Sequence, residues 1–392
     1  MFTFSFEIST LSGALFGCAV TLFIIIVFIY LKPVARVSRA VKIQNDSQQK
    51  PGMSQPVSVI VFADDDSESL RRLLPAVLGQ SYEAPFEVIV VNDGQSDTTT
   101  EIVERLRLIH NNLYMTYTPV GAKQLSRKKL ALLIGIKAAR YSVVVHTTSS
   151  AIIDSENWLA RIAEPFADDA VEVVLGHSYL DHNADKKTLK RSRVFNSVAD
   201  ASVWLSSAIK GKPYRGTELN LAYTRDAFFR NKGFSGTLNL KYGDDDVFIN
   251  EIATGRNTRV VLHPESFVRR SSERVAHTYG ELRSRYCFTA AQLPHAGRRL
   301  NALGAYLMWA VVALCVAGAL FMLPNLLGVA IGAVILVAMF LSAIVVWRKA
   351  VKTLTGRKML LSLPALMLLR PLANIVAYVK SEKNKRYYYS WS

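Results

Sequence analysis

The chain has 392 residues, of which 50% are hydrophobic, and its mean hydropathy of +0.18 is high for a soluble enzyme. Lys and Arg number 47 against 31 Asp and Glu, which gives a net charge of +16. This composition excludes a disordered chain, a collagen-like fibre and a disulfide-built secreted module. It leaves a membrane protein with a globular domain, or a basic soluble protein with an apolar tail.

Three segments without a charged residue predict membrane-spanning helices. They are residues 11–31, 303–323 and 326–347, each close to the ~20 residues that a helix needs to cross a bilayer. Only Pro324 and Asn325 separate the last two, which predicts a hairpin. The first segment could instead be a cleavable signal peptide, but no basic residue precedes it and no small-residue cleavage site follows it. We therefore expect an uncleaved anchor.

Basic residues flank these segments on one side only. They follow the first segment, precede the second and follow the third: Lys32, Arg36, Arg39, Lys42, Arg298, Arg299, Arg348, Lys349 and Lys352. By the positive-inside rule, the N-terminus lies outside, and the central region and the C-terminus are cytoplasmic. More than half of the net charge lies outside residues 33–302, where it can contact anionic head groups. No nucleic-acid partner is needed to explain the charge, and none is expected.

The C-terminal part predicts a helix that lies on the membrane. Residues 359–379 are apolar, but Pro364, Arg370 and Pro371 interrupt them. Because an Arg in the middle of a span is costly, an interfacial or re-entrant helix is favoured over a fourth span. The basic and aromatic residues that follow suit the head-group layer.

The central region, after a polar linker at 45–56, alternates between predicted strands and helices. The strands are expected at 57–63, 86–91, 113–118 and 142–146, and the helices at 69–80, 99–108 and 128–139. This alternation is typical of an α/β domain with an open parallel sheet covered on both faces. Such sheets bind ligands at the carboxyl ends of their strands.

Polar residues follow three of these strands. Asp64 to Asp66 follow the first, Asn92 and Asp93 the second, and Thr147 to Ser150 the fourth. Each could simply cap the helix after it. Because they share one edge of the predicted sheet, a nucleotide crevice is the better interpretation of the whole set.

At this point the sequence resembles a membrane-bound family 2 glycosyltransferase with the GT-A nucleotide-sugar-binding (Rossmann-like) fold. The resemblance covers about residues 57–286. It rests on the segments VSVIVFADDDSESLRRLLPAVLGQSY, FEVIVVNDGQSDTTTEIV, KKLALLIGIKAAR, NWLARIAEPF, NLAYTRDAFFRNKGFSG and KYGDDDVFIN. It implies transfer of a sugar from a nucleotide-sugar donor to an acceptor hydroxyl, which a carboxylate base deprotonates.

The resemblance also assigns roles to residues. Asp245 is the best candidate for the base, with Asp244 and Asp246 beside it, although the three could instead form a helix N-terminal cluster. Asp93 matches the aspartate that contacts the nucleotide base. The other expected nucleotide-binding residues are Ala63, Asp65, Lys128, Lys129, Arg283 and Arg285.

Three motifs depart from the family pattern. Many members hold Mg2+ or Mn2+ with an Asp-x-Asp motif, where this chain has Thr147, Thr148 and Ser149. Neutral hydroxyls are weak ligands for such cations, so we expect weakened or absent metal dependence and assign no metal ligand. The acceptor-side segment runs from Gly216 to Asn220, with Glu218 in place of a glycine. Leu282 occupies the position where the family's interfacial Gln-x-x-Arg-type motif has a glutamine.

These observations predict five segments: an anchor at 1–32, a linker at 33–56, the transferase domain at 57–302, a transmembrane hairpin at 303–347 and a basic interfacial segment at 348–392. The expected function is sugar transfer to a lipid-linked or polysaccharide acceptor at the cytoplasmic face of a bacterial inner membrane. The alternative is an inactive member that acts as a binding or scaffold partner of other envelope glycan enzymes.

Overall fold

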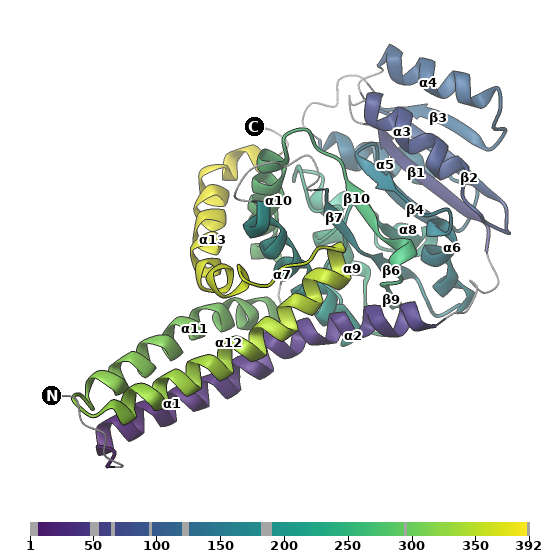
Figure 1. Cartoon of the computed structure of the whole chain (residues 1–392). Coiled ribbons are helices and arrows are strands. Elements are labelled where there is room, and N and C mark those ends of the chain that lie inside the picture. The colour runs from purple at the N-terminus through teal and green to yellow at the C-terminus, as the bar shows by residue number, and fades with distance from the viewer. Residues whose placement is uncertain are drawn as a thin grey trace. The chain divides into compact units, whose positions relative to one another are not determined.

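The computed structural model describes residues 7–47, 55–63, 67–93, 96–119, 125–181, 190–293 and 296–389. They form two compact units, which Figure 1 shows in one view. The first, here the helical unit, comprises Met1–Arg39, Arg191–Ser206 and His295–Val376. The second, here the sheet unit, comprises Ala40–Lys190, Ser207–Pro294 and Ala377–Ser392.

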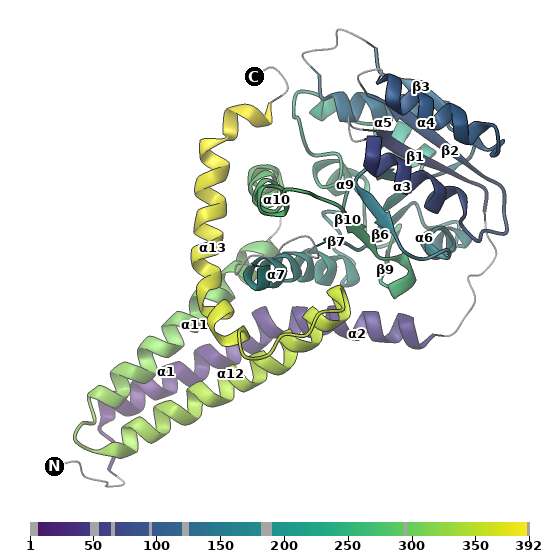
Figure 2. The ribbon, with the colours of Figure 1, turned by 45° about the horizontal axis from the view of Figure 1, so that its top comes forward.

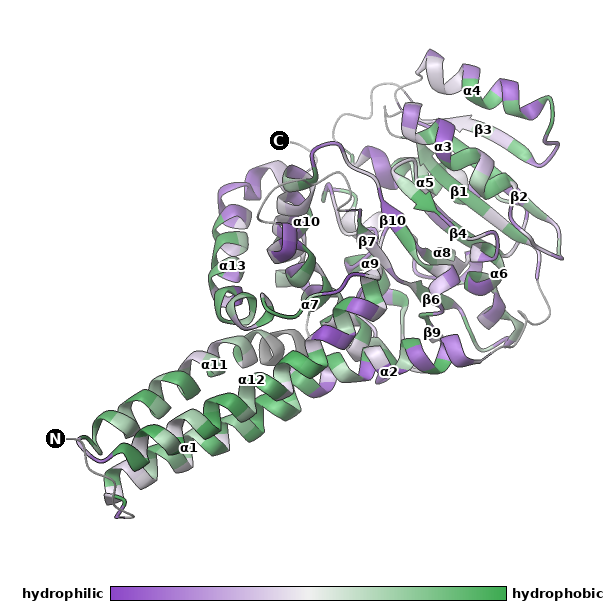
Figure 3. Ribbon diagram, viewed as in Figure 1, coloured by the Kyte–Doolittle hydropathy of each residue, from purple (hydrophilic) through white to green (hydrophobic). Residues whose placement is uncertain are grey.

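Long apolar helices make up most of the helical unit. The helices that contribute to it are α1 (Thr10–Ile26), the π-helical turn η1 (Val27–Leu31), α2 (Lys32–Asp46), α7 (Lys190–Ile209), α11 (Ala296–Leu320), α12 (Leu326–Thr355) and α13 (Leu363–Lys383). α1, α11 and α12 lie side by side and are largely hydrophobic (Figures 2 and 3). Four helices of the described chain could cross a membrane by length and composition: Thr10–Asp46, Ala302–Leu320, Leu326–Thr355 and Leu363–Lys383. They include all three expected spans.

Two parts of the helical unit differ from the sequence prediction. Residues 32–46, expected to be mostly linker, continue the first helix, because Val34, Val37 and Val41 recur at helical spacing and are buried. Residues 191–206, expected within the transferase domain, belong to the helical unit through α7. The ring of Phe195 lies 4.9 Å from that of Trp347, a contact between distant segments that no local pattern reveals.

The sheet unit contains a seven-stranded sheet and a three-stranded sheet. The large sheet has the order β3-β2-β1-β4-β8-β6-β9 and the small one the order β5-β10-β7. Their strands are β1 (Val57–Ala63), β2 (Phe86–Asn92), β3 (Leu113–Tyr117), β4 (Val143–Thr148), β5 (Ala151–Ile153), β6 (Val173–Gly176), β7 (Ser178–Leu180), β8 (Leu221–Thr224), β9 (Thr258–Val261) and β10 (Val268–Arg270). All four predicted strands are present.

The four predicted strands form the parallel part of the large sheet, and the sheet becomes mixed at β8, which was not predicted. Strands β3, β2, β1 and β4 are parallel, whereas β8 pairs antiparallel with both β4 and β6. In this register Leu221, the first residue of β8, lies opposite His146 near the end of β4. The antiparallel direction therefore brings the segment before β8, residues 216–220, to the carboxyl edge of the sheet.

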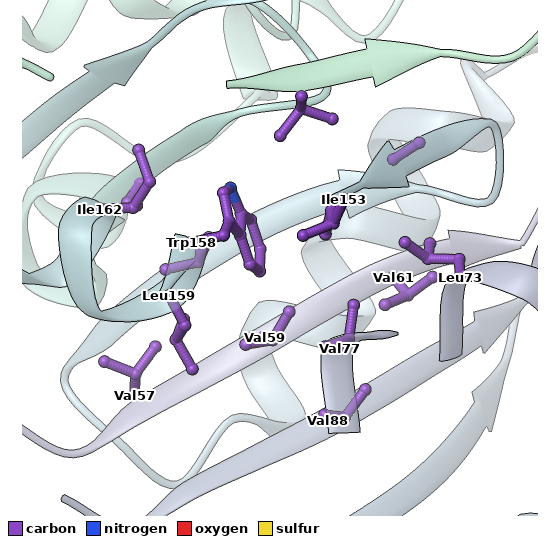
Figure 4. Close-up of a cluster of buried hydrophobic side chains, with 14 of the residues drawn as sticks. Val57, Val59, Val61, Leu73, Val77, Val88, Ile153, Trp158, Leu159 and Ile162 are labelled. Carbon is purple, nitrogen blue, oxygen red and sulfur yellow. The ribbon is translucent and has the colours of Figure 1, made fainter. Parts of the chain in front are cut away.

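Helices cover both faces of the large sheet. The sheet unit contains α3 (Ser67–Leu78), α4 (Asp97–Arg107), α5 (Arg127–Ala138), α6 (Trp158–Ala163), α8 (Arg225–Arg230), α9 (Val247–Ile252) and α10 (Val275–Thr289). On one face, Val59 and Val61 of β1 pack in a cluster with Leu73 and Trp158 (Figure 4). On the other, Gly135 lets α5 approach the sheet closely, because a Cβ there would lie 2.7 Å from Ile60. Burial on both faces explains why β1 is an uninterrupted apolar run.

The remaining helical segments are short 3-10 helices: η2 (Glu164–Ala167), η3 (Ser235–Thr237), η4 (Pro264–Ser266), η5 (Ala290–Gln292) and η6 (Lys385–Tyr388). The last of these belongs to the aromatic tail that was expected in the head-group layer. In the structure, Tyr388 shares a hydrogen bond with Ser284 and packs its ring 4.9 Å from that of Phe288. The tail docks on α10 because these tyrosines find hydroxyl and aromatic partners there.

Candidate active site

The three adjacent aspartates, Asp244, Asp245 and Asp246, lie in a buried loop before α9. Gly243 precedes them with a φ of +107°, a backbone conformation that favours glycine. Asp246 caps α9, since its carboxylate accepts a hydrogen bond of 2.7 Å from the Val247 amide. Asp246 is therefore a helix cap, whereas the carboxylates of Asp244 and Asp245 have other partners.

One carboxylate oxygen of Asp245 accepts several hydrogen bonds, and the other accepts none from the described residues. Its Oδ2 accepts hydrogen bonds from Arg285 Nη2 at 2.9 Å, from the Glu218 amide at 3.1 Å and from the Tyr286 hydroxyl. Its Oδ1 is buried and has no hydrogen-bond partner among the described residues. Burial, opposed by Arg285 and reinforced by Asp244 and Asp246, raises the pKa of Asp245 to about 6. A fixed carboxylate with a free oxygen and a raised pKa suits a general base.

Asp244 is ionised and paired. Its Oδ2 lies 2.6 Å from Lys128 Nζ at the start of α5. Burial raises the pKa of Asp244, but Lys128 and Arg285 together outweigh burial and hold the pKa below its ordinary value. A carboxylate bound to an ammonium group in this way is a poor proton acceptor, so Asp245 is the better base candidate.

Glu218 is the centre of the charge network. Arg285 Nη1 lies 3.0 Å from both of its oxygens, and Lys128 and Arg270 each pair with one of them. The residue is only 5% exposed. Burial would raise the pKa of Glu218, but the three cations, led by Arg285, hold it well below its ordinary value. We name Lys128, Glu218, Asp244, Asp245, Arg270 and Arg285 the ion cluster.

The four basic residues expected to bind the nucleotide lie in different places, and only two of them belong to the ion cluster. Lys128 and Arg285 belong to it. Lys129 instead donates to the Thr237 carbonyl at 2.6 Å, and burial lowers its pKa to about 8. Arg283 lies along its own helix, 3.4 Å from the Tyr279 hydroxyl.

Sequence reasoning missed three residues of this region. Arg270 enters the ion cluster from β10, a strand that carries no family motif. Tyr286 binds Asp245, and the guanidinium of Arg215 stacks 3.2 Å from the centre of the Tyr286 ring. The only signal for Tyr286 is its position directly after Arg285 in the interfacial motif.

The edge of the sheet that is expected to bind the nucleotide base lies only partly within the described residues. The Asp93 amide donates to the Ala63 carbonyl at 3.2 Å, which places both at the ends of β1 and β2. The Asp93 carboxylate accepts from Thr118 at 2.7 Å and lies 2.7 Å from Arg127. Asp65, with Asp64 and Asp66, lies outside the described residues.

The degenerate metal motif does not offer a metal site. Thr147 and Ser149 are buried, and the Thr147 hydroxyl has no hydrogen-bond partner among the described residues. One position further on, the hydroxyls of Thr148 and Ser150 share a hydrogen bond of 2.9 Å, and Ser150 accepts from Arg270 at 3.1 Å. Within the described ranges, no three His, Cys, Asp or Glu side chains form a metal-binding group. A guanidinium beside hydroxyl ligands disfavours a second cation, so these residues do not fit Mg2+ or Mn2+.

His146 is a structural residue. It is buried at the end of β4, its ring lies 5.7 Å from that of Tyr223, and burial lowers its pKa to about 4. A neutral, buried imidazole packed on an aromatic ring is typical of a structural histidine.

The acceptor-side segment positions the base candidate and joins the two sheets. The Gly216 amide donates to the Asp245 carbonyl at 2.6 Å. Asn220 is fully buried, accepts from Trp158 Nε1 at 3.0 Å and donates to the carbonyls of His177 and Ser266. Asn220 therefore has a structural role, which leaves residues 216–218 to face the ion cluster.

Comparisons with known proteins bear on the family and the fold of the chain. Residues 58–236 match the model of glycosyl transferase family 2. The poly-beta-1,6-N-acetyl-D-glucosamine synthase of Staphylococcus epidermidis is 29% identical over 120 residues, which are 30% of this chain and 26% of the synthase. The Staphylococcus aureus enzyme of that name is 30% identical over 100 residues, 26% of this chain and 23% of the synthase. The matches thus span about a quarter of these relatives' length.

The fold has a counterpart among solved structures. A mannosyltransferase from Pyrobaculum calidifontis, solved in complex with GDP-Man and Mn2+, superposes with a TM-score of 0.53 at 19% identity, covering 88% of this chain and all of that one. At this identity the likeness establishes the fold alone. Residues 58–236 are therefore similar to glycosyl transferase family 2, and the chain has the GT-A fold.

Proposed function

We propose that this protein is a membrane-anchored glycosyltransferase in which Asp245 is the general base. The observation that carries the proposal is the Asp245 carboxylate, whose Oδ2 is held by Arg285, Tyr286 and the Glu218 amide while Oδ1 is left without a hydrogen-bond partner among the described residues. Asp246 caps α9. Asp244 also has an oxygen without a hydrogen-bond partner among the described residues, but its other oxygen pairs with Lys128 and its pKa lies below the ordinary value.

In this reaction the acceptor hydroxyl gives its proton to Asp245 Oδ1 while its oxygen bonds to the anomeric carbon of the donor sugar. The bond from that carbon to the diphosphate breaks, and the nucleoside diphosphate leaves with the electron pair. Basic side chains stabilise the charge that develops on the leaving group. Lys128, Arg270 and Arg285 are the cations of the ion cluster that can do so, in place of a metal.

The anchoring helices support an acceptor at the membrane. With α1, α11 and α12 as spans, the basic flanks place the sheet unit on the cytoplasmic face of the inner membrane. An acceptor that is lipid-linked, or a polysaccharide growing at the membrane, suits this position. The matched relatives are polysaccharide synthases by name, which agrees with a glycan product.

A second candidate function is favoured by one observation. The ion cluster contains three cations and three carboxylates that already neutralise one another. A site whose charges are already neutralised by its own side chains suits a non-catalytic member of the family, which would act as a scaffold for other envelope glycan enzymes.

Donor turnover separates the two candidates. The full chain is purified in detergent with EDTA, and release of UDP or GDP is measured with a panel of nucleotide sugars. The glycosyltransferase proposal expects turnover of one donor and a loss of about a hundredfold or more in Asp245→Asn. Asp226→Asn, which changes an exposed carboxylate on α8, is the matched control and should retain full activity. No turnover of any donor by the wild type, together with no binding of UDP or GDP, would favour the scaffold.

A further inference from the structure

Three basic side chains from three different elements converge on one carboxylate in the sheet unit. Lys128 comes from the first turn of α5, Arg270 from β10 and Arg285 from α10, and all three pair with Glu218. Arg285 contacts the carboxylate through one nitrogen, with Nη1 3.0 Å from each oxygen. Three cations around two oxygens form the type of site in which proteins hold phosphate or carboxylate anions.

The backbone of Glu218 shows where this carboxylate lies relative to the base candidate. The Glu218 amide donates to Asp245 Oδ2 at 3.1 Å, and the Arg285 guanidinium bridges the two side chains, 3.0 Å from Glu218 and 2.9 Å from Asp245. A glycine at position 218 would keep the amide contact and leave the space of the side chain empty. The Glu218 side chain therefore lies beside Asp245 and in contact with the three cations, one of which, Arg285, contacts both carboxylates.

The charges of the ion cluster show what Glu218 neutralises. Lys128 also pairs with Asp244, and Arg285 also pairs with Asp245. Arg270 has only the Ser150 hydroxyl besides Glu218 among the contacts of the described residues. Without Glu218, the cluster would hold three cations and two carboxylates, and Arg270 would have no anionic partner. Such a site attracts an anion.

We propose that the Glu218 carboxylate occupies the anion subsite of this protein, and that a phosphoanion binds to Lys128, Arg270 and Arg285 by displacing it. Identifying the phosphoanion as the diphosphate of a nucleotide sugar rests on the proposed function. The displacement itself depends only on the geometry of the cluster. Glu218 thus acts as a competing internal ligand, which lowers the affinity for phosphoanions and keeps the cations assembled when none is bound.

Pyrophosphate is the probe that tests displacement without a sugar or a nucleotide base. The full chain in detergent is titrated with pyrophosphate by calorimetry at fixed ionic strength with EDTA, as wild type and as Glu218→Gln. Because glutamine keeps the shape but removes the competing charge, the variant should bind pyrophosphate about tenfold more tightly or better. Equal or weaker binding by Glu218→Gln overturns the proposal.

A control and a second variant keep this test decisive. Glu172→Gln removes another ion-paired carboxylate, 2.6 Å from Arg230, and should leave pyrophosphate binding at the wild-type level. If Glu218→Gln does not fold, Glu218→Asp replaces it: aspartate keeps the charge, but its shorter side chain cannot reach all three cations. This variant must then bind pyrophosphate more tightly than the wild type, and equal binding overturns the proposal.

The two proposals fail in different ways. Tighter pyrophosphate binding by Glu218→Gln, with no turnover of any nucleotide sugar, would support the displaceable anion and contradict the glycosyltransferase. Turnover with equal pyrophosphate binding by the wild type and Glu218→Gln would support the transferase and contradict the displaceable anion.

Discussion

Asp244, Asp245 and Asp246 are adjacent in sequence, but their different partners give each of them a different environment in this site. Asp246 accepts hydrogen bonds from the α9 amide and from Thr289, and one oxygen of Asp244 pairs with Lys128, which holds the pKa of Asp244 below its ordinary value. Asp245 keeps an oxygen without a partner among the described residues and has the raised pKa. The GDDD motif could locate the base to within three residues, whereas the choice among them depends on Lys128, Thr289 and Arg285, which are distant in sequence.

The first prediction at this scale concerns pH. Because the pKa of Asp245 is raised from 3.8 to about 6, its basic form is complete well above pH 6 and is lost as the pH falls through that value. Turnover should therefore fall about tenfold for each pH unit below 6. The measurement is kcat/KM for the donor between pH 4.5 and 8, and an unchanged rate down to pH 4.5 would contradict Asp245 as the base.

The second prediction concerns Asn220 and stability. Asn220→Ala leaves Trp158 Nε1 and the carbonyls of His177 and Ser266 buried without their present partner. Unfolding free energy should fall by about 3 kcal/mol. Asn231→Ala, whose exposed side chain bonds Glu251 at 3.0 Å, is the control and should change stability little. The test is chemical denaturation followed by tryptophan fluorescence. A cost for Asn220→Ala no larger than that of the control would argue against its structural role.

At the scale of elements, the helical unit depends on small residues where its helices meet. A Cβ at Gly304 of α11 would lie 2.6 Å from Tyr30 Cβ, and one at Gly318 would lie 2.8 Å from the Phe16 ring. These distances are too short for a side chain, so α11 and the first helix can approach only where glycine is present. Hydropathy predicted these helices well, because a long apolar segment has few alternatives in a membrane. It could not predict which faces meet.

Gly304→Ala and Gly17→Ala form a matched pair that tests this packing. The Gly304 variant should lower stability by about 1–3 kcal/mol, because the new methyl group forces Tyr30 or the backbone to move. Gly17 has nothing within 4 Å of its would-be Cβ, so its variant should be neutral or slightly stabilising. Thermal unfolding in the same detergent compares the two, and equal melting temperatures would contradict the proposed contact.

Arg370 shows why one element was difficult to predict. Its charge favoured an interfacial helix over a span, whereas α13 is long and apolar enough to cross a membrane. Within the helical unit Arg370 is buried, 3.0 Å from Asp200 and 3.2 Å from Asn196, both on α7. A paired arginine costs much less than an isolated one. The partner on α7 is 170 residues away, so local sequence could not reveal it.

At the scale of the whole molecule, the C-terminal tail limits the topology. Tyr388 is bonded to Ser284, and the Lys241 amide donates to its carbonyl at 2.9 Å, both within the sheet unit. If α11 and α12 both cross a membrane, the tail and this unit lie on the same side of it, and α13 begins and ends on that side. An interfacial α13 together with three spans satisfies this condition.

A reporter fused to the C-terminus tests this topology. Three spans with the N-terminus outside predict a fluorescent C-terminal green fluorescent protein fusion and an inactive C-terminal alkaline phosphatase fusion. The matched pair is the same two reporters fused in the Pro324–Asn325 turn, where only the phosphatase should be active. An active phosphatase at the C-terminus would mean that α13 crosses the membrane.

Local sequence determined much of this protein. The apolar segments specified the expected spans, and the strand-helix alternation specified the four parallel strands of the domain, because burial on both faces of a strand requires a continuous apolar run. The GDDD and acceptor-side motifs located the candidate site. The tertiary structure alone decided the antiparallel β8, the place of α7 in the helical unit, and the meeting of Glu218 with Lys128, Arg270 and Arg285. Each of these depends on contacts between residues far apart in the chain, whose energies no local pattern contains.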